Sequence, residues 1–427
     1  MGDVTLRILY TFLYLLLLPV IILRLYWRSL HAPAYRKRLS ERFALVPKRH
    51  GDRALIWVHA VSVGEAIAAT PMVRRLMKQY PAVDICITTT TPTGSERVRS
   101  AFGDKVLHYY LPYDVPLLFL IFIKALRPNL LVVMETELWP NMVATCVQHR
   151  LPVILANGRM SSGSARGYRR FAGLTRPMLQ QLAAIAAQSA ADAERFIALG
   201  ADPERVTVTG SIKFDIDIDQ TVFDRVVALR NQLDYRNRRL VIFASTHPGE
   251  DEQILPMVKR LHHLAPEFLA LIVPRHPERF QPVYELCAAH KLNAVRISDG
   301  RPCTAETQVI IGDTMGDMLA FYGLSDVAFI GGSLLKHGGH NFLEAAAWGL
   351  PLLSGRYVFN FQSIADMLVN EHGLLLMRDH YELERTLQAW LKQPRCLAGI
   401  GVAARQVFEE NQGALDKLLM LIQQQMD

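Results

Sequence analysis

Cysteine is scarce and scattered in this chain of 427 residues. The five cysteines form no Cys-x-x-Cys pair; they are Cys86, Cys146, Cys287, Cys303 and Cys396. An odd, dispersed set argues against a disulfide framework and against a cysteine-based zinc site. We therefore expect reduced thiols, some of them buried, as is usual in the cytosol.

The sequence also lacks short repeats and low-complexity tracts. Half of its residues are hydrophobic and 20% are charged, so extended disorder is not expected. The length suits two domains of about 200 residues each. The net charge of +7 favours nucleic acid, an anionic membrane surface or anionic substrates as partners.

Charge is absent from residues 8–23, ILYTFLYLLLLPVIIL. As a helix this run would be about 24 Å long, somewhat short of a hydrocarbon core of roughly 30 Å. Six cations follow it: Arg24, Arg28, Arg36, Lys37, Arg38 and Arg42. We predict that residues 1–30 are a membrane anchor, spanning or interfacial, and that the cations meet anionic lipids on the cytoplasmic face. A cleaved signal peptide and a buried core helix are the alternatives. Because the basic cluster lies beside the anchor, nucleic acid is the weaker partner.

Short apolar runs alternate with helical patterns after about residue 53. This punctuation predicts an α/β fold with two doubly wound parallel sheets. We expect a first domain over residues 31–212, an inter-domain region over 213–239 and a second domain over 240–427. Ligands of such folds bind at the carboxyl ends of strands, here in a cleft between the two halves.

The first half carries carboxylates and hydroxyls at expected strand exits. Glu65 follows the run Trp57-Val-His-Ala-Val61 and is expected to lie in the first turn of a helix. It could accept a proton from an acceptor hydroxyl, or it could simply be a carboxylate that the helix dipole stabilises. The hydroxyls of 88–94 suit sugar or phosphate oxygens, or form a plain N-cap cluster. Glu135 and Glu137 could hold sugar hydroxyls, position a cation or stabilise positive charge, or lie in a capped loop.

Cations and glycines gather at the strand exits near the domain junction and in the second half. Lys213 is expected to be a free cation for a phosphate or carboxylate, or a surface lysine. Arg275 offers a planar fork for phosphate, and His276 a proton donor or a cap. The loops 312–317 and 331–344 are rich in glycine, the geometry that cradles phosphate and ribose. His337 and His340 lack a third ligand at matching spacing, so no metal site is predicted.

As an ordered set, these residues resemble the Kdo transferases, the 3-deoxy-D-manno-oct-2-ulosonic acid transferases of lipopolysaccharide synthesis. The motifs that carry the resemblance extend over nearly the whole chain: Ala34-Tyr-Arg-Lys-Arg38, Ser62-Val-Gly-Glu65, Thr91-Pro-Thr-Gly-Ser-Glu-Arg97, Leu111-Pro-Tyr-Asp114, Met134-Glu-Thr-Glu-Leu-Trp-Pro-Asn141, Gly210-Ser-Ile-Lys-Phe-Asp215, Pro274-Arg-His-Pro-Glu-Arg-Phe280, Gly312-Asp-Thr-Met-Gly316, Gly331-Gly-Ser333 and Gly338-Gly-His-Asn341. The resemblance implies a GT-B glycosyltransferase fold, CMP-Kdo as donor, a lipid A precursor (lipid IVA) as acceptor, inversion, no metal, and the cytoplasmic face of the bacterial inner membrane.

The resemblance also implies roles for single residues. Glu65 would be the general base, and Glu135 and Lys213 would assist the transition state. The positions that match CMP contacts are Pro274, Arg275, Met315, Gly316, Asp317, Asn341, Phe342, Leu343 and Glu344. The family often has Glu where this chain has Asp317, so a side-chain contact there would be re-made through water or backbone. It commonly has Pro where this chain has Phe342, which predicts a less rigid loop.

Two other functions fit part of the pattern. A sugar-nucleotide epimerase can have the same fold, but it would leave the anchor unexplained. A tethered scaffold that binds nucleotide sugars would leave Glu65, Glu135 and Lys213 without a task.

Overall fold

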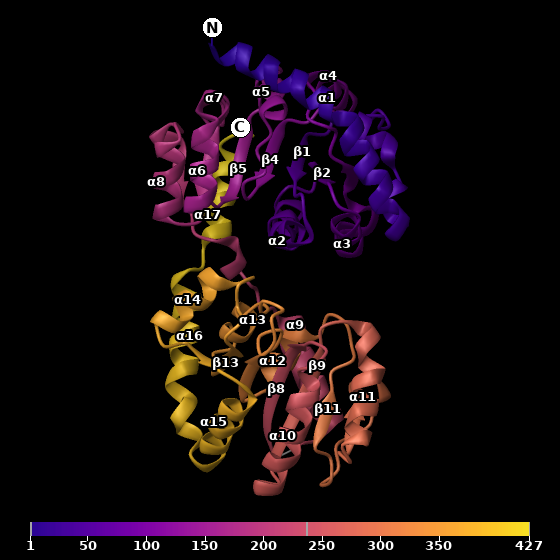
Figure 1. The fold of residues 1–427 in the computed structure, drawn as a ribbon, viewed down its shortest axis with the longest axis vertical. Coiled ribbons are helices and arrows are strands. Elements are labelled where there is room, and N and C mark those ends of the chain that lie inside the picture. Colours follow the sequence, from indigo (N-terminus) through magenta and orange to yellow (C-terminus); the bar gives the residue numbers. More distant parts are fainter. Residues whose placement is uncertain (1, 236–237, 427) are drawn as a thin grey trace. The chain divides into compact units, whose positions relative to one another are not determined.

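The computed structural model describes residues 2–235 and 238–426, and in it the chain forms two compact units. The first unit is Met1–Asp215 with Gln412–Asp427, and the second is Ile216–Asn411. Each unit contains a seven-stranded sheet with helices packed around it (Figure 1). All paired neighbours in both sheets run parallel. The predicted class, two doubly wound parallel α/β units, is confirmed.

The sheet of the first unit has the strand order β3-β2-β1-β4-β5-β6-β7. Its strands are β1 (Leu55–His59), β2 (Asp84–Thr89), β3 (Leu107–Tyr110), β4 (Leu130–Met134), β5 (Val153–Gly158), β6 (Ala184–Ala187) and β7 (Val206–Val208). The helices that follow strands in this unit are α2 (Val63–Gln79), α3 (Pro92–Phe102), α4 (Pro116–Leu126), α5 (Pro140–Gln148), α6 (Ser162–Arg170), α7 (Ala172–Gln180) and α8 (Ala190–Ala198).

Strand β1 is buried on both faces because helices cover both sides of the sheet. Side chains alternate between faces along a strand, and β1 accordingly supplies two core clusters. Trp57 belongs to one cluster and packs against Phe122 of α4, with ring centroids 5.0 Å apart. Val58 belongs to the other, which includes Met72 of α2. This double burial explains the continuous apolar run of the strand.

The sheet of the second unit has the order β10-β11-β9-β8-β12-β13-β14. Its strands are β8 (Arg239–Thr246), β9 (Phe268–Pro274), β10 (Ala294–Arg296), β11 (Val309–Ile311), β12 (Val327–Ile330), β13 (Leu352–Gly355) and β14 (Leu374–Met377). Its helices are α9 (Gln220–Leu233), α10 (Asp251–Leu264), α11 (Phe280–Ala289), α12 (Met318–Leu324), α13 (Leu343–Ala346), α14 (Gln362–Asn370), α15 (His380–Lys392) and α16 (Ala398–Glu410). Sequence reasoning missed β10 and β14, the two short edge strands.

Short 3-10 helices occur at several turns. They are η1 (Pro33–Arg36), η2 (Leu39–Phe43), η3 (Gly103–Lys105), η4 (Pro203–Arg205), η5 (Ile212–Phe214), η6 (Pro277–Arg279), η7 (Ile297–Asp299) and η8 (Pro394–Leu397). Of these, η5 carries Lys213.

The expected inter-domain region over 213–239 is largely part of the second unit. It contains α9, whose first turn is capped by Asp219, the acceptor of the Val222 N–H at 3.2 Å. Leu229 and Leu233 are fully buried, and the Tyr235 hydroxyl donates to the Leu324 carbonyl at 2.8 Å. Polar residues outnumber the buried ones in α9, and for this reason the sequence predicted an inter-domain region here.

The last helix, α17 (Ala414–Gln423), corrects the predicted second domain of 240–427, because it packs on the first unit. Leu418 and Ile422 are fully buried in the same core cluster as Met72. The Asp215 carboxylate accepts the N–H groups of Gly413 and Leu415, each at 2.7 Å. The chain therefore passes between the units twice.

The N-terminal helix α1 (Gly2–His31) lies against α5 and α7 (Figure 1). The Tyr10 hydroxyl donates to Asp114 Oδ2 at 2.8 Å, and the Thr11 hydroxyl donates to Asn141 Oδ1 at 3.1 Å. The stretch Thr5–Leu30 is long and apolar enough to cross a membrane, and its most apolar window is not buried within the structure. The alternative of a buried core helix is therefore wrong. The anchor and the signal peptide remain predictions.

The six cations after the apolar run do not share one environment. Arg28 lies over the Tyr35 ring, and Arg36 donates to Ser29 Oγ. Arg42 is buried and donates to the Thr90 carbonyl at 2.6 Å. Arg38 bonds to Glu41 Oε1 at 2.6 Å. Arg38 also donates to the His108 carbonyl at 2.5 Å. We therefore correct the prediction for Arg38 and Arg42, whose guanidinium groups are bound within the first unit and do not face lipid. The pattern of charges along the sequence did not reveal this.

The docking of α17 generates a stability prediction. Leu418→Ala should lower the free energy of unfolding by about 2–5 kcal/mol, because a fully buried leucine leaves a cavity. Met420 lies on the same helix but is 55% exposed, so Met420→Ala should change it by less than about 0.5 kcal/mol. Urea unfolding followed by circular dichroism measures both. Equal effects of the two substitutions would contradict the packing of α17 on the first unit.

Candidate active site

Glu65 lies in the first turn of α2, directly after the exit of β1. Ser62 is the N-cap, and its hydroxyl accepts the Glu65 N–H at 3.3 Å. The Glu65 carboxylate in turn accepts the Val61 N–H and the Ser62 hydroxyl, each at 2.8 Å. This reciprocal arrangement resembles a capping box, so the local sequence Ser-x-x-Glu both begins the helix and fixes the carboxylate.

The environment of Glu65 favours proton uptake near neutral pH. The side chain is 7% exposed, and burial raises its pKa to about 7. The hydrogen bonds from Val61 and Ser62 oppose this shift, and the charges of Glu137 and Glu135 add to it. A carboxylate with a pKa near the working pH is suited to general base catalysis. The helix-dipole interpretation and the base interpretation of Glu65 are thus compatible.

Glu135 and Lys213 form an ion pair, with Lys213 Nζ 3.2 Å from Glu135 Oε1. Glu135 follows β4 and has a φ of 55°, a left-handed conformation that is uncommon outside glycine. The Glu135 N–H donates to the Ala156 carbonyl at 2.8 Å, which extends the β4–β5 pairing. The prediction that Lys213 is a free cation is therefore wrong, because the carboxylate of Glu135, which follows another strand, pairs with it.

Glu137 completes a group of three carboxylates in the first unit. Burial and then the charge of Glu135 raise the pKa of Glu137. Next to it, the Tyr168 hydroxyl donates to the Thr136 carbonyl at 3.2 Å, and burial followed by the charge of Glu137 raises the Tyr168 pKa. Like charges held this close are costly, which favours a functional use of the group.

The hydroxyls of residues 88–91 are used within the protein. Thr88 Oγ1 accepts the Trp57 indole N–H at 2.8 Å, and the Thr90 hydroxyl donates to the Val61 carbonyl at 3.2 Å. Thr91 is the N-cap of α3 and accepts the Gly94 N–H at 3.1 Å. These bonds favour the N-cap alternative for this segment.

In the second unit, Pro274 ends β9 and Arg275 follows it with an exposed side chain. The Arg275 N–H donates to the Thr246 carbonyl at 3.0 Å, which ties this turn to the exit of β8. Arg279 donates to the same carbonyl and forms an ion pair at 2.6 Å with the buried Asp251. The guanidinium of Arg275 is thus presented to solvent from a braced turn.

Three of the residues predicted to contact CMP lie before α12. Met315 is 73% exposed, and Gly316 has a φ of 93°, a conformation that glycine adopts without strain. The Asp317 carboxylate is held by Arg225 at 2.6 and 3.0 Å and by the Thr314 hydroxyl at 2.6 Å. Burial raises its pKa, but the bonds from Arg225 and Thr314 outweigh burial and leave it lowered. The Asp317 carboxylate is thus already bound by side chains of its own unit.

The remaining predicted CMP residues surround the start of α13. Asn341 Nδ2 donates to Glu344 Oε1 at 3.2 Å, and burial raises the Glu344 pKa while Arg275 lowers it. Phe342 and Leu343 are fully buried, and Phe342 packs edge-on against Phe361. Burial prevails over the Asn341 bond and the charge of Arg275, so the Glu344 pKa is raised. Phe342 thus holds this part of the loop by side-chain packing, whereas a proline would restrict the backbone through its ring.

Four histidines gather near Arg275. His247, His337 and His340 stack, with His247 ring centroids 4.4 Å from His337 and 5.0 Å from His340. His276 meets His247 edge-on. Burial, and then the charge of Arg275, lowers the His340 pKa to about 3. Among residues 2–235 and 238–426, no group of three or more His, Cys, Asp or Glu has the arrangement of a metal site. Metal independence stays a prediction.

The glycine-rich loop after β12 does not offer its amides to a ligand. The N–H groups of Gly332, Ser333 and Leu334 all donate to the carboxylate of Glu250. The expectation that this part of the loop cradles phosphate is therefore wrong. Glu250 was missed from the sequence, although Thr246-His-Pro-Gly-Glu250 follows a strand in the same manner as Ser62-Val-Gly-Glu65.

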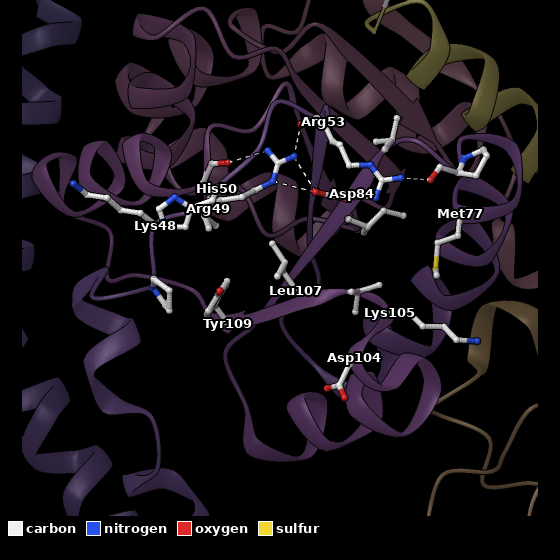
Figure 2. A pocket seen from close by; sticks show the side chains of 16 residues that line it. Lys48, Arg49, His50, Arg53, Met77, Asp84, Asp104, Lys105, Leu107 and Tyr109 are labelled. Atoms are coloured by element: carbon white, nitrogen blue, oxygen red, sulfur yellow. Dashed lines mark hydrogen bonds and ion pairs between the residues drawn. The ribbon is translucent and has the colours of Figure 1, made fainter.

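A cavity of about 480 Å³ lies at the amino ends of β2 and β3, where Asp84 and Leu107 begin these strands. Arg49 and Arg53 both reach toward Asp84 (Figure 2), at 2.9 and 3.4 Å. This cavity is at the opposite end of the sheet from Glu65 and Glu135. Both guanidinium groups pair with Asp84, and we place no catalytic function there.

The family model described as 3-deoxy-D-manno-octulosonic-acid transferase (kdotransferase) matches residues 37–216. A 3-deoxy-D-manno-octulosonic acid transferase of Haemophilus influenzae is 42% identical over 422 residues, 97% of this chain and 98% of the relative. One from Rickettsia bellii is 30% identical over 416 residues, again 97% and 98%.

The fold resembles that of UDP-GlcNAc 2-epimerase from Neisseria meningitidis, solved bound to UDP-GlcNAc. The TM-score is 0.57 with 12% identity, over 87% of this chain and 100% of the epimerase chain. At this identity the likeness concerns the fold alone. The match to the curated transferases extends over almost the full length of both chains. The chain belongs to the family of 3-deoxy-D-manno-octulosonic acid (Kdo) transferases, glycosyltransferases built from two parallel α/β units of the GT-B type.

Proposed function

We propose that the chain transfers Kdo from CMP-Kdo to a lipid A precursor (lipid IVA) in lipopolysaccharide synthesis, with inversion and without a metal. The observation that carries the proposal is Glu65, a buried carboxylate with a raised pKa at a strand exit, within a full-length match to Kdo transferases. The acceptor is assigned to the first unit and the nucleotide to the second.

Glu65 takes the proton of the acceptor's primary hydroxyl while that oxygen attacks C2 of Kdo. The new O–C2 bond forms as the bond from C2 to the CMP phosphate oxygen breaks, and CMP leaves with the electron pair. Attack opposite to the leaving group inverts C2. The pKa of about 7 leaves Glu65 ionised enough to accept a proton near neutral pH.

Charge develops on both sides of the breaking bond. Glu135 stabilises the positive charge at C2, together with the carboxylate of Kdo itself. Arg275 balances the negative charge that grows on the phosphate, because its guanidinium is exposed and its charge acts on Glu344 in the first turn of α13. Lys213, 3.2 Å from Glu135, holds that carboxylate in place and adds a second positive charge, in addition to that of Arg275, for the phosphate.

The nucleotide is assigned to Pro274 and Arg275, to Met315, Gly316 and Asp317, and to Asn341, Phe342, Leu343 and Glu344. The exposed Met315 and Arg275 suit direct contact. Because Arg225 engages the Asp317 carboxylate, CMP would meet the backbone or a water at this position. The Glu344 carboxylate can accept hydrogen bonds from ribose hydroxyls.

Helix α1 and its cations are assigned to the cytoplasmic face of the bacterial inner membrane. The apolar side chains of Leu16, Leu17 and Leu23 are exposed, as a lipid-facing helix requires. Arg24, Arg28, Arg36 and Lys37 are exposed and available to anionic head groups at about 1 kcal/mol each, whereas Arg38 and Arg42 are bound within the first unit. This placement brings the enzyme to its phosphorylated lipid acceptor.

Mass spectrometry of lipid products tests the function. The full chain, in anionic vesicles that contain a tetra-acylated lipid A precursor, should add Kdo units to the lipid when CMP-Kdo is supplied. A chain lacking residues 2–30 should modify the vesicle-bound lipid more slowly. Consumption of CMP-Kdo without any lipid acceptor would favour an epimerase or hydrolase, and CMP binding without transfer would favour a scaffold.

Substitution of Glu65 tests the base. Glu65→Gln keeps the size of the side chain but cannot take a proton, so kcat should fall by about 10²–10⁴-fold while CMP binding is kept. Glu96→Gln is the matched control, since Glu96 is an exposed carboxylate on α3. Near wild-type transfer by Glu65→Gln would remove Glu65 from the mechanism.

The pH dependence follows from the raised pKa of Glu65. Only the ionised form accepts a proton, so kcat/KM should rise about tenfold per pH unit below pH 7 and level off above it. This midpoint reflects the pKa of about 7 in the free enzyme. Initial rates across this range, at lipid concentrations well below KM, provide the profile. A profile that is already flat at pH 5 would contradict the shifted pKa.

A further inference from the structure

Glu250 is a fully buried carboxylate at the start of α10, and four backbone N–H groups donate to it. Oε2 accepts the His247 N–H at 3.0 Å and the Gly332 N–H at 2.7 Å. Oε1 accepts the N–H groups of Ser333 and Leu334, each at 2.9 Å. A carboxylate has about four lone-pair positions, so these donors saturate it.

The four bonds join two segments that are distant in the sequence. Oε2 alone ties the turn after β8, through His247, to the loop after β12, through Gly332. Gly332 has a φ of 68°, and a Cβ there would lie 2.9 Å from the His340 ring. The same Cβ would lie 3.3 Å from the His247 ring of the other segment, so glycine, which adopts this φ without strain, suits the close approach. The loop then closes on itself, because the Gly339 N–H donates to the Gly332 carbonyl at 2.8 Å.

The joined segments carry the His247–His340 pair. The two Nε2 atoms are 2.8 Å apart, a hydrogen bond in which one imidazole donates and the other accepts. Their rings are nearly parallel, at 5°. His340 directly precedes Asn341, and Glu344 follows in α13. The geometry of the loop is therefore passed on to the residues assigned to the nucleotide.

We propose that Glu250 is a positioning residue of the donor site, which fixes the His247–His340 pair and the loop that presents Asn341 and Glu344. This inference rests on the proposed function, since it assigns the donor to these residues. Glu250 does not touch the donor. It acts as an internal anion that occupies the amides of the glycine-rich loop and so directs the phosphate of the donor toward Arg275.

Glu250→Gln in the full-length chain tests the proposal. The amide NH₂ cannot accept the two N–H groups that face one oxygen, so the loop should loosen. We expect hydrogen exchange of the Gly332–Leu334 amides to accelerate at least about tenfold and CMP affinity to fall by a similar factor. Glu252→Gln is the matched control, because Glu252 is an exposed carboxylate in the first turn of α10 that accepts the Gly249 N–H at 2.7 Å.

Chemical rescue separates positioning from general stability. Glu250→Ala leaves a space lined by four N–H donors, which sodium formate can fill. Formate should restore CMP affinity to within about threefold of wild type. Sodium chloride at the same concentration should not, and Glu252→Ala should respond to neither salt. A loss caused only by instability would not be recovered by a small anion in this manner.

Each outcome decides the proposal. It is overturned if folded Glu250→Gln binds CMP within twofold of wild type, or if both glutamine variants lose affinity equally. It is also overturned if Glu250→Gln does not fold, because the carboxylate would then be a requirement of the unit as a whole. If the wild-type chain itself binds no CMP, the proposed function fails. If it binds CMP and Glu250→Gln binds equally, only the positioning role fails.

Discussion

The burial of carboxylates at the carboxyl ends of parallel strands is the constraint from which the chemistry of this protein follows. A carboxylate removed from water must be met by hydrogen-bond donors, or its charged form becomes costly. Glu65 and Glu250 lie at similar places in their units, each at the start of the helix that follows the first strand of its sheet. In both sheets that strand is flanked by the second strand and by a later one, at the switch point.

The number of donors separates the two residues. Glu65 receives one N–H group and one hydroxyl, and burial raises its pKa to about 7. Glu250 receives four N–H groups and is saturated. The same position thus holds a carboxylate that can take up a proton in one unit and a carboxylate that binds two backbone segments in the other. Donor satisfaction, more than residue type, decides which strand-exit carboxylate is available for chemistry.

Much of this could be predicted from the sequence, because the signals were local. The alternation of apolar runs and helices predicts both sheets, and Ser62-Val-Gly-Glu65 predicts a capped helix with a carboxylate at a strand exit. What could not be predicted depends on partners far away in the chain. Lys213 forms an ion pair with Glu135, the Gly332 N–H donates to Glu250, and α17 packs in the core of the first unit. An apolar helix face shows that a helix is buried, but it does not show against what. The prediction for Arg42 is wrong for the same reason, because the sequence beside an apolar run does not show that a cation is buried.

A direct measurement of the Glu65 pKa tests the account most closely. The ¹³C carboxyl resonance of Glu65 can be identified as the glutamate signal absent from Glu65→Gln and then followed against pH in the full-length chain. The account predicts a midpoint near pH 7, because burial outweighs the two hydrogen bonds to the carboxylate. A midpoint near the ordinary value of 4.5 would show that the site leaves Glu65 solvated, and would contradict its role as the base.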